Sequence, residues 1–333
     1  MTLRVGFYGA GFISRYHGAL LAASGVDHAV VAVHDPDAGR AAAFAAEHGA
    51  AAVAEDELCG LVDAVYVTTW TSEHARLVER AASAGVAVFC EKPLAADAGT
   101  VARMVAAVEE AGVPNQVGLV LRFLPSFLRL RRLVTDPRAG EVLAVVFRDD
   151  QFIPDQGLYG STWRTDAARA GRGTLLEHSI HDVDILRWMF GPVASVSATT
   201  REVHGHPRID DVTVARLAFA SGVSATLTSV WHDVLERPSL RRVEVLCSRL
   251  FAALEGDFAG PVRWQFTGSP EEVLAGADLV AAEPSSNQAT AFLAAVRDGT
   301  RAQPSFAEAL PAHRVVDALY ASAAAGGAVT VAE

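Results

Sequence analysis

The sequence predicts an α/β fold, with a parallel sheet in an N-terminal domain and a large, mostly antiparallel open sheet in a C-terminal α+β domain. Over residues 1–120, short apolar runs alternate with amphipathic segments, as in right-handed βαβ units. After Arg122, strand-like runs follow one another through short turns such as Ala220-Ser221-Gly222. We therefore expect two domains, at residues 1–120 and 121–333.

The first domain is predicted from the alternation of two periodicities. Short buried apolar runs indicate strands, and apolar residues at helical spacing indicate the segments between them. The expected strands are Leu3–Tyr8, Ala29–His34, Ala64–Thr69, Ala87–Cys90 and Gln116–Leu121. The expected helices are Ile13–Ser24, Asp37–His48, Ser72–Ala84 and Ala98–Glu110.

The second domain is predicted from consecutive strand patterns with few helices between them. The expected strands are Val142–Asp149, Ala194–Glu202, Thr213–Ala220, Val223–His232, Val243–Leu246, Leu250–Leu254 and Val262–Gln265. The expected helices are Phe127–Val134, Leu175–Phe190, Asn287–Asp298 and Phe306–Ala323.

Composition excludes several classes of partner. The chain has 333 residues, of which 51% are hydrophobic and 20% charged, typical of a globular protein with a sizeable core. The 28 basic and 39 acidic residues give a net charge of −11, which disfavours nucleic acid and membrane surfaces. Cys59, Cys90 and Cys247 are scattered, and residues 1–20 lack the pattern of a signal peptide, so we expect a cytoplasmic protein.

A glycine-rich turn follows the first strand. In Gly9-Ala10-Gly11-Phe12-Ile13-Ser14, Gly9 permits a tight turn and Gly11 lets the backbone approach a pyrophosphate at a helix N-terminus. Ser14 replaces the usual third glycine. Asp35 ends the second strand, where a carboxylate binds a ribose diol and repels a 2′-phosphate. The sequence therefore predicts a Rossmann domain that binds NAD rather than NADP.

Two further features suggest chemistry. Lys92 is the single lysine among 28 basic residues, and an ammonium performs chemistry that a guanidinium does not. In the expected helix around residues 176–184, Glu177, His181 and Asp184 are spaced i, i+4 and i+7 and share one face. Glu177, His178 and His181 are residue types that bind metals, but no fourth ligand is suggested, so we expect no metal.

Four stretches carry a family resemblance: Val5–His17, Asp63–His74 (DAVYVTTWTSEH), Gly85–Leu94 (GVAVFCEKPL) and Trp163–Gly191 (WRTDAARAGRGTLLEHSIHDVDILRWMFG). Together they resemble the glucose–fructose oxidoreductase / inositol dehydrogenase / MocA family of nicotinamide-dependent oxidoreductases. The resemblance continues through Phe292–Val331 and covers nearly the whole chain.

The resemblance implies roles for three residues. Lys92 matches the family's catalytic lysine, which stabilises alkoxide charge, and Lys92–Pro93 is a candidate cis peptide. His181 matches the general acid/base. Glu177 matches a carboxylate one turn earlier, where relatives usually carry Asp, and it either contacts substrate or orients His181.

The resemblance also extends the expected ligand contacts. Trp70 replaces a proline common in relatives, and the Trp163–Arg164 pair borders the nicotinamide pocket in parts of the family. The expected cofactor contacts are Gly9, Gly11, Phe12, Ile13, Asp35, Thr68, Thr69, Trp70, His74, Glu91, Lys92, Trp163 and Arg164. The expected substrate contacts are Lys92, Arg122, Asp149, Glu177, His178 and His181.

These features predict an NAD-dependent dehydrogenase that transfers hydride between a secondary alcohol or ketone of a sugar, cyclitol or aminosugar-type ring and the nicotinamide. A homodimer or homotetramer is expected, because an open sheet with one uncovered face usually finds a partner. Two alternatives come from other classes: an NAD-dependent glycoside hydrolase that uses transient oxidation, and a non-catalytic NAD-binding regulator. The hydrolase would accumulate no NADH, and the regulator would need no acid/base pair.

Overall fold

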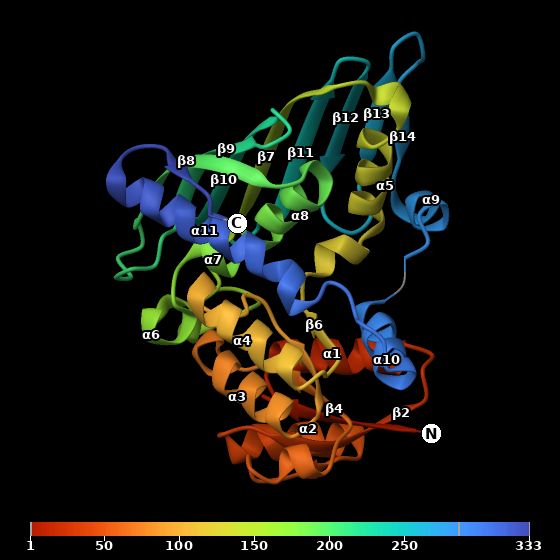
Figure 1. The fold of residues 1–333 in the computed structure, drawn as a ribbon, viewed down its shortest axis with the longest axis vertical. Coiled ribbons are helices and arrows are strands. Elements are labelled where there is room, and N and C mark those ends of the chain that lie inside the picture. The colour runs from red at the N-terminus through yellow and green to blue at the C-terminus, as the bar shows by residue number, and fades with distance from the viewer. Residues whose placement is uncertain (1, 286, 333) are drawn as a thin grey trace. The chain divides into compact units, whose positions relative to one another are not determined.

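A computed structural model describes residues 2–285 and 287–332 (Figure 1). The chain forms two compact units, the first from residues 2–119 and 287–311 and the second from residues 120–285 and 312–332. Residues 287–311 thus belong to the first unit, whereas the sequence analysis placed them in the second domain. Among the described helices, none has the length and apolar character that a bilayer crossing requires.

The first unit is a six-stranded parallel sheet in the order β3-β2-β1-β4-β5-β6. Its strands are β1 (Leu3–Tyr8), β2 (His28–His34), β3 (Ala51–Ala52), β4 (Ala64–Val67), β5 (Ala87–Cys90) and β6 (Asn115–Val117). Its helices are α1 (Phe12–Ala22), α2 (Ala38–His48), η1 (Leu58–Gly60), α3 (Thr71–Ser83), α4 (Ala98–Glu110) and α10 (Gln288–Asp298). This strand order is that of the doubly wound dinucleotide-binding fold.

Helices cover both faces of this sheet. On one face, α1, α2 and α10 contribute to a core with Phe7 and Tyr66, while α3 and α4 pack in a second core on the other face. Phe292 of α10 contacts the Tyr66 ring at 5.6 Å, which shows why the C-terminal segment returns to this unit. The expected strand Gln116–Leu121 ends early, at Val117, and a 3₁₀ turn, η2 (Val120–Phe123), follows.

The second unit is built on a nine-stranded sheet in the order β14-β13-β12-β11-β7-β10-β9-β8-β15. The strands are β7 (Val142–Phe152), β8 (Val193–Arg201), β9 (Val212–Phe219), β10 (Ser224–His232), β11 (Leu240–Cys247), β12 (Leu250–Glu255), β13 (Val262–Phe266), β14 (Glu272–Leu274) and β15 (Val329–Thr330). Of the described pairs, β7–β10 is parallel and the rest are antiparallel, which confirms the mostly antiparallel prediction.

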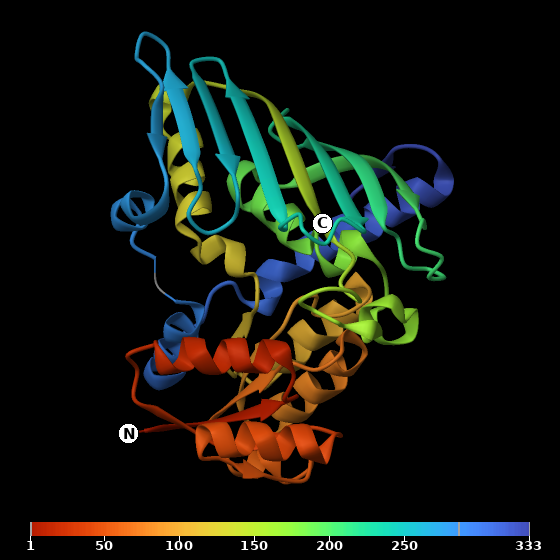
Figure 2. The ribbon, with the colours of Figure 1, turned by 180° about the vertical axis from the view of Figure 1, so that it is seen from behind.

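Helices lie on one face of this sheet. The helices of the unit are α5 (Pro125–Val134), η3 (Pro137–Ala139), η4 (Thr162–Thr165), α6 (Ala167–Ala170), α7 (Thr174–Glu177), α8 (Ile180–Phe190), α9 (Gly276–Ala282) and the later part of α11 (Phe306–Ala325). Residues of α5, α8 and α11 form one core with the inner side chains of the strands. Figure 2 shows the opposite face of the sheet with no described helix over it.

A row of polar side chains crosses the inner face of this sheet. Thr213 of β9 stands opposite Ser229 of β10, Ser229 opposite Asp149 of β7, and Asp149 opposite Arg241 of β11. All four side chains are buried. We call these four residues the polar row. Because buried polar groups need partners, the row determines what packs over it.

The helix expected at Leu175–Phe190 is broken, and that prediction was wrong in this detail. α7 ends at Glu177 and α8 begins at Ile180. The Ser179 hydroxyl donates to Ser229 Oγ at 2.6 Å, and the Thr174 hydroxyl lies 2.8 Å from the same oxygen. These bonds hold the start of α7 and the residue before α8 against Ser229 of the polar row. Glu177 therefore lies on a different helix from His181 instead of sharing one continuous face with it.

The start of α7 lies against the backbone of Asp210. The Asp210 carboxylate accepts the amide hydrogens of Gly173 at 3.0 Å and Leu175 at 3.1 Å, and its carbonyl accepts that of Thr174 at 2.7 Å. A Cβ atom at Gly173 would overlap the Asp210 backbone. Only glycine permits this approach.

We expect Gly173→Ala to lower the free energy of unfolding by about 1–3 kcal/mol, because a rigid backbone would have to move to admit the methyl group. Gly327→Ala is the control, since a Cβ there meets nothing within 4 Å. Denaturant unfolding of both variants measures the difference. Equal stability of the two would contradict the close approach at Gly173.

Candidate active site

In the first unit, the turn between β1 and α1 is held against β4. Gly9 has φ +98°, and a Cβ there would lie 2.7 Å from the Thr68 carbonyl oxygen. The Thr68 hydroxyl donates to the Tyr8 carbonyl at 2.9 Å and lies 2.9 Å from Ser14 Oγ. Ser14, at the third position of the glycine motif, therefore joins helix to strand by a hydrogen bond rather than by glycine packing.

The same turn leaves its outer side open. Gly11 is the N-cap residue of α1, has no side-chain cap, and a Cβ there would meet nothing within 4 Å. Phe12 beside it is 61% exposed, and Ile13 is partly buried. Dinucleotide pyrophosphates bind at the N-terminus of a helix of this kind, here eleven residues long with a glycine at the N-cap. The loop therefore fits such a cofactor.

Asp35 follows β2 and is fixed beside this turn. Its Oδ2 accepts the Ala10 amide hydrogen at 2.8 Å and its Oδ1 accepts that of Asp37 at 2.8 Å. Each carboxylate oxygen accepts more than one hydrogen bond, so capacity for ribose hydroxyls remains. Gly9, Asp35, Thr68 and Glu91 each follow a parallel strand at its carboxyl end, the edge where such sheets bind ligands.

The loops after β4 and β5 are braced by one histidine. His74 is buried, with Nδ1 2.9 Å from the Pro93 carbonyl oxygen and Nε2 3.3 Å from that of Thr69. Thr69 and Trp70 are half-buried. The Thr68 hydroxyl and the His74 ring bind other groups of the protein, so both residues organise the edge where the cofactor contacts are expected.

Lys92 is positioned through its neighbour Glu91. The Glu91 carboxylate accepts the Lys92 amide hydrogen at 3.0 Å and lies 2.6 Å from His17 Nε2. The Lys92–Pro93 peptide is cis. Burial alone would raise the pKa of Glu91, but His17 and Lys92 hold it below its usual value. Sequence reasoning missed His17, because nothing in α1 indicates that this buried histidine binds Glu91, 74 residues later in the chain.

In the second unit, the buried Glu177 carboxylate forms an ion pair with the partly exposed Arg164. The Arg164 Nε atom lies 3.1 Å from Glu177 Oε2, and the Arg164 guanidinium stacks on the Trp163 ring at 4.7 Å. Arg164 also donates to Ser161 Oγ at 2.9 Å. The structure therefore joins a residue expected to contact cofactor with one expected to act near the substrate.

His181 lies in the first turn of α8 and is 7% exposed. One turn further on, the Asp184 carboxylate accepts two hydrogen bonds from Arg122, at 2.6 and 2.8 Å. Arg122, expected at the substrate, is thus bound to the helix that carries His181. A bidentate pair of this kind is among the stronger charged contacts.

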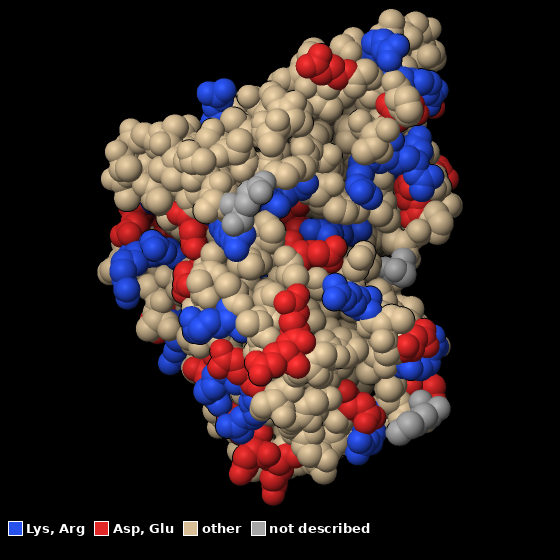
Figure 3. Space-filling model, in the orientation of Figure 1, with Lys and Arg blue, Asp and Glu red and all other residues tan. Residues whose placement is uncertain are grey.

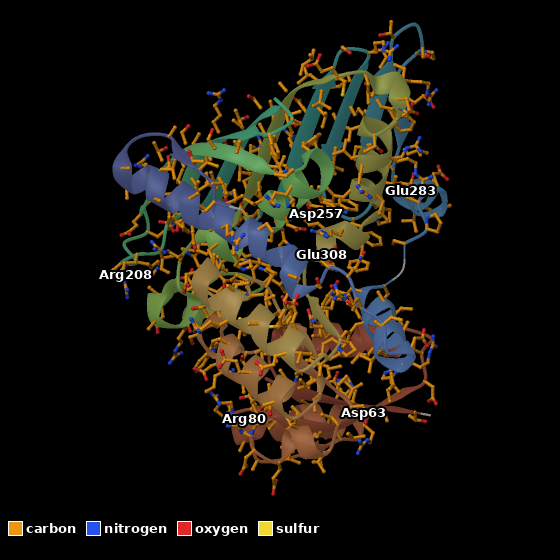
Figure 4. The ribbon with its side chains drawn as sticks, viewed as in Figure 1. Asp63, Arg80, Arg208, Asp257, Glu283 and Glu308 are labelled. Carbon is orange, nitrogen blue, oxygen red and sulfur yellow. The ribbon has the colours of Figure 1, made fainter. Side chains whose placement is uncertain are left out.

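A second charged cluster lies beneath α8. Arg241 Nε donates to Asp182 Oδ1 at 2.7 Å, its Nη1 to Asp257 Oδ2 at 2.6 Å, and its Nη2 lies 3.0 Å from Asp149 Oδ2. His178 Nε2 lies 2.9 Å from the same Asp149 oxygen. Asp257, labelled in Figure 4, follows β12. One guanidinium therefore faces three carboxylates.

Sequence reasoning named Asp149 and His178 in this cluster but missed Asp182, Arg241 and Asp257. A signal existed for Arg241. The alternation in β11 places it on the same face as Val243 and Val245, and a charge at a core position calls for a partner. Nothing comparable marks Asp182 or Asp257.

Burial dominates the protonation of this cluster. It raises the pKa of Asp149 to about 6, against the lowering effect of Arg241. It raises the pKa of Asp182 to about 7, and the charge of Asp149 contributes to that rise. The native state therefore retains protons on this pair at pH values where an unfolded chain has released them.

Because the folded protein retains these protons, its free energy of unfolding should fall as the pH rises. Because the folded-state pKa of Asp182 lies above the unfolded value, its stabilising contribution is complete below pH 4 and is lost as the pH rises through about 7. Asp182→Asn cannot ionise. We expect its free energy of unfolding, relative to wild type, to increase by about 2–4 kcal/mol between pH 4 and pH 8. Denaturant unfolding at both pH values measures it, and a constant difference would contradict the raised pKa.

Among the described residues, no group of three or more His, Cys, Asp and Glu side chains is arranged to hold a metal ion.

Comparisons with known proteins fit this geometry. Residues 3–119 match the family described as "Oxidoreductase family, NAD-binding Rossmann fold", and residues 127–250 match the "GFO/IDH/MocA C-terminal domain". The chain is 31% identical over 347 residues to an inositol 2-dehydrogenase of Rhizobium meliloti (strain 1021), covering 100% of both chains. It is 33% identical over 238 residues to a 1,5-anhydro-D-fructose reductase of Ensifer adhaerens, covering 69% of this chain and 68% of that protein.

A levoglucosan dehydrogenase solved in complex with NADH shares the fold, with a TM-score of 0.89 and 20% identity over 100% of both chains. Family matches to both halves and a relative aligned over its full length show that this chain is an oxidoreductase of the Gfo/Idh/MocA family, with the NAD-binding Rossmann domain of that family.

Proposed function

We propose that the chain is an NAD-dependent dehydrogenase acting on a secondary alcohol of a sugar, cyclitol or aminosugar-type ring, with Lys92 and His181 as its catalytic pair. The observation that carries the proposal is the placement of the only lysine. Lys92 follows β5, and the buried Glu91 carboxylate holds its backbone amide. The names of relatives, an inositol dehydrogenase and an anhydrofructose reductase, support the substrate class.

When bound, NAD supplies a hydride acceptor for the carbon that bears the hydroxyl group. His181 takes the hydroxyl proton, which suits an imidazole whose ordinary pKa lies near neutrality. The Lys92 ammonium stabilises the alkoxide charge as the carbonyl forms. Arg164 offsets the charge of Glu177, so that Glu177 serves as a hydrogen-bond acceptor rather than a second base. Ketone reduction reverses each proton movement.

We propose that the turn at Gly9 and Gly11 holds the pyrophosphate, and that Asp35 holds the adenosine ribose. Expected contacts from Phe12, Ile13, Thr69, Trp70, Trp163 and Arg164 belong to the same proposal. The open side of Gly11 and the fixed Asp35 carboxylate support this part. A carboxylate at that point repels a 2′-phosphate, which favours NAD over NADP.

A homo-oligomer and a cytoplasmic location are also proposed. The uncovered face of the nine-stranded sheet exposes apolar side chains at Val146, Val214, Leu246 and Phe251, a feature typical of an interface. The three cysteines are free, which suits a reducing compartment. Acidic and basic side chains are interspersed on the face in Figure 3, which fits a small-molecule partner better than nucleic acid.

The experiment that tests the reaction is a screen of sugars, inositols and aminocyclitols with NAD, followed by NADH absorbance. We expect NADH to accumulate with at least one polyol. Substrate cleavage without NADH would favour the glycosidase alternative.

The first prediction from this proposal concerns the cofactor. We expect NAD to bind more tightly than NADP, because the Asp35 charge opposes the additional phosphate. Calorimetric titration of the purified protein with each nucleotide gives both dissociation constants. Asp35→Asn should bring the dissociation constants of NAD and NADP closer together. Equal affinities in the wild-type protein would remove the assigned role of Asp35.

The second prediction concerns the catalytic pair. We expect Lys92→Ala to lower kcat by a factor on the order of 10² or more, with NAD affinity largely unchanged, because alkoxide stabilisation is lost. His181→Ala should lower kcat similarly, most of all near neutral pH. It should also remove the step by which the rate of alcohol oxidation rises as His181 loses its proton. Steady-state kinetics across pH, with the screened substrate, measure these effects.

Lys92→Arg is the matched control, because it keeps the positive charge in a chain that otherwise uses only arginine. We expect it to remain strongly impaired, since a planar guanidinium does not replace a compact ammonium. Near wild-type activity of Lys92→Arg would overturn the mechanism.

A further inference from the structure

The segment that carries Glu177, His178 and His181 is linked by hydrogen bonds or ion pairs to all four residues of the polar row, in the case of Thr213 through Asp210. Thr213 donates to the Asp210 carboxylate at 3.2 Å, and Asp210 in turn caps the start of α7. Ser229 binds Thr174 and Ser179. Asp149 binds His178, and Arg241 binds Asp182. Residues 173–182 are therefore positioned from below by side chains of four neighbouring strands.

Among these contacts, we expect the loss of the Arg241 ion pairs to destabilise the protein most. Arg241, Asp149 and Asp182 are almost completely excluded from solvent. Taking charges out of water costs several kcal/mol per ion, so each of these groups depends on its partners. Asp182 is the chain neighbour of His181 in the first turn of α8. A shift of the Asp182–Arg241 contact must therefore also move His181.

We propose that Arg241 and Asp182 are positioning residues for the reaction: with Asp149 they hold the first turn of α8, and thus His181, in place, and they determine which ring nitrogen of His178 carries the proton. This inference rests on the proposed function, since it concerns the proton transfer assigned to His181. Neither Arg241 nor Asp182 touches the reacting atoms in this assignment.

The effect on His178 follows from hydrogen-bond chemistry. His178 Nε2 lies within hydrogen-bond distance of Asp149 and 3.3 Å from Arg241 Nη2. When Asp149 is ionised, Nε2 must carry a hydrogen to donate to it. When Asp149 is protonated, Nε2 can accept instead, from Asp149 or from Arg241. The proton count of the cluster therefore fixes the tautomer of His178.

The cluster also makes the positioning depend on pH. The charged and titratable groups facing Asp182 and Asp149 are Arg241 from β11, Asp257 after β12, Asp150 from β7 and His178 from the α7–α8 junction. Ionisation of the pair completes the ion pairs to Arg241. Because burial raises both pKa values, this occurs between about pH 6 and pH 7. The rate should then contain an ionisation that does not belong to His181.

The test compares Asp182→Asn, Arg241→Lys and Arg241→Met with Arg242→Met. Arg242 is the matched control, because it is the next residue of β11, half-exposed, and paired with Glu255 instead of the cluster. We expect Asp182→Asn to lower kcat tenfold or more at pH 8, with KM and the dissociation constant of NAD changed less than threefold. Misplacement of a catalytic group by about 1 Å has effects of this size or larger.

Three readouts separate a positioning role from general damage to the fold. Asp182→Asn should gain relative stability at alkaline pH, so its loss of rate is not unfolding. Arg241→Lys should recover part of the rate that Arg241→Met loses, because it restores a charge without the fork of donors. The ionisation that remains in His181→Ala should shift by about half a pH unit or more in Asp182→Asn, because only Asp149 of the pair can then ionise. Arg242→Met should match wild type in all respects.

Nitrogen NMR of the His178 ring tests the cluster without any activity. We expect the tautomer of His178 to change over the pH range in which the pair ionises, and Asp182→Asn to shift that change by about half a pH unit or more. Failure of His181→Ala to reduce kcat would count against the proposed function while leaving this signature intact. An unshifted His178 signal, or a kcat of Asp182→Asn within twofold of wild type, would overturn the positioning role.

Discussion

The second unit depends on the burial of four polar side chains in one row across the inner face of its sheet. Thr213, Ser229, Asp149 and Arg241 stand in register on β9, β10, β7 and β11, where apolar side chains would be the simpler choice. Each must find a partner or forfeit a hydrogen bond. Ser229, Asp149 and Arg241 have partners in the segment around α7 and the start of α8, and Thr213 is linked to that segment through Asp210. The segment therefore has one favourable arrangement on the sheet.

In the first unit, the loops at the carboxyl edge of the sheet are also held in place by polar contacts, with fewer charged groups. The β1–α1 turn, the end of β4 and the end of β5 are joined through Thr68, Ser14 and the His17–Glu91 pair. These are contacts between neighbouring parallel strands and the helix that connects them. Such contacts are typical of the carboxyl edge of a doubly wound sheet. They leave Gly11 open while fixing the backbone around it.

Much of the fold was predictable from the sequence because its signals are local. Alternating apolar runs and helical periodicity located Leu3–Tyr8, Ala87–Cys90 and Ala98–Glu110 at the bounds that the structure has. Lys92 and the glycine turn were recognisable from residue type and spacing alone. The break after Glu177 was not, because its cause is Ser229, a residue 50 positions after Ser179. Periodicity reports which face of a helix is apolar, and says nothing about hydroxyl groups on a distant strand.

The same limit explains the other misses. The apolar face of α10 predicts burial but not which of two cores it joins, so Phe292 was placed with the wrong domain. Among the cluster residues, Asp149 was named from its place at the end of an expected strand, and His178 from its place beside Glu177. Arg241 was identifiable from strand alternation, and Asp182 only from its contacts.

The sequence separation between the polar row and its partners bears on how the unit assembles. Asp182 and Arg241 lie 59 residues apart, and Asp149 pairs with Arg241 only once β7 and β11 are aligned. Contacts of this kind carry a loop-closure cost that must be met before they contribute, so they form late. Until then Arg241 and its carboxylates stay hydrated. We therefore expect the final desolvation of the cluster to fall on the native side of the folding barrier. Changes there should mainly accelerate unfolding and leave the rate of folding little altered.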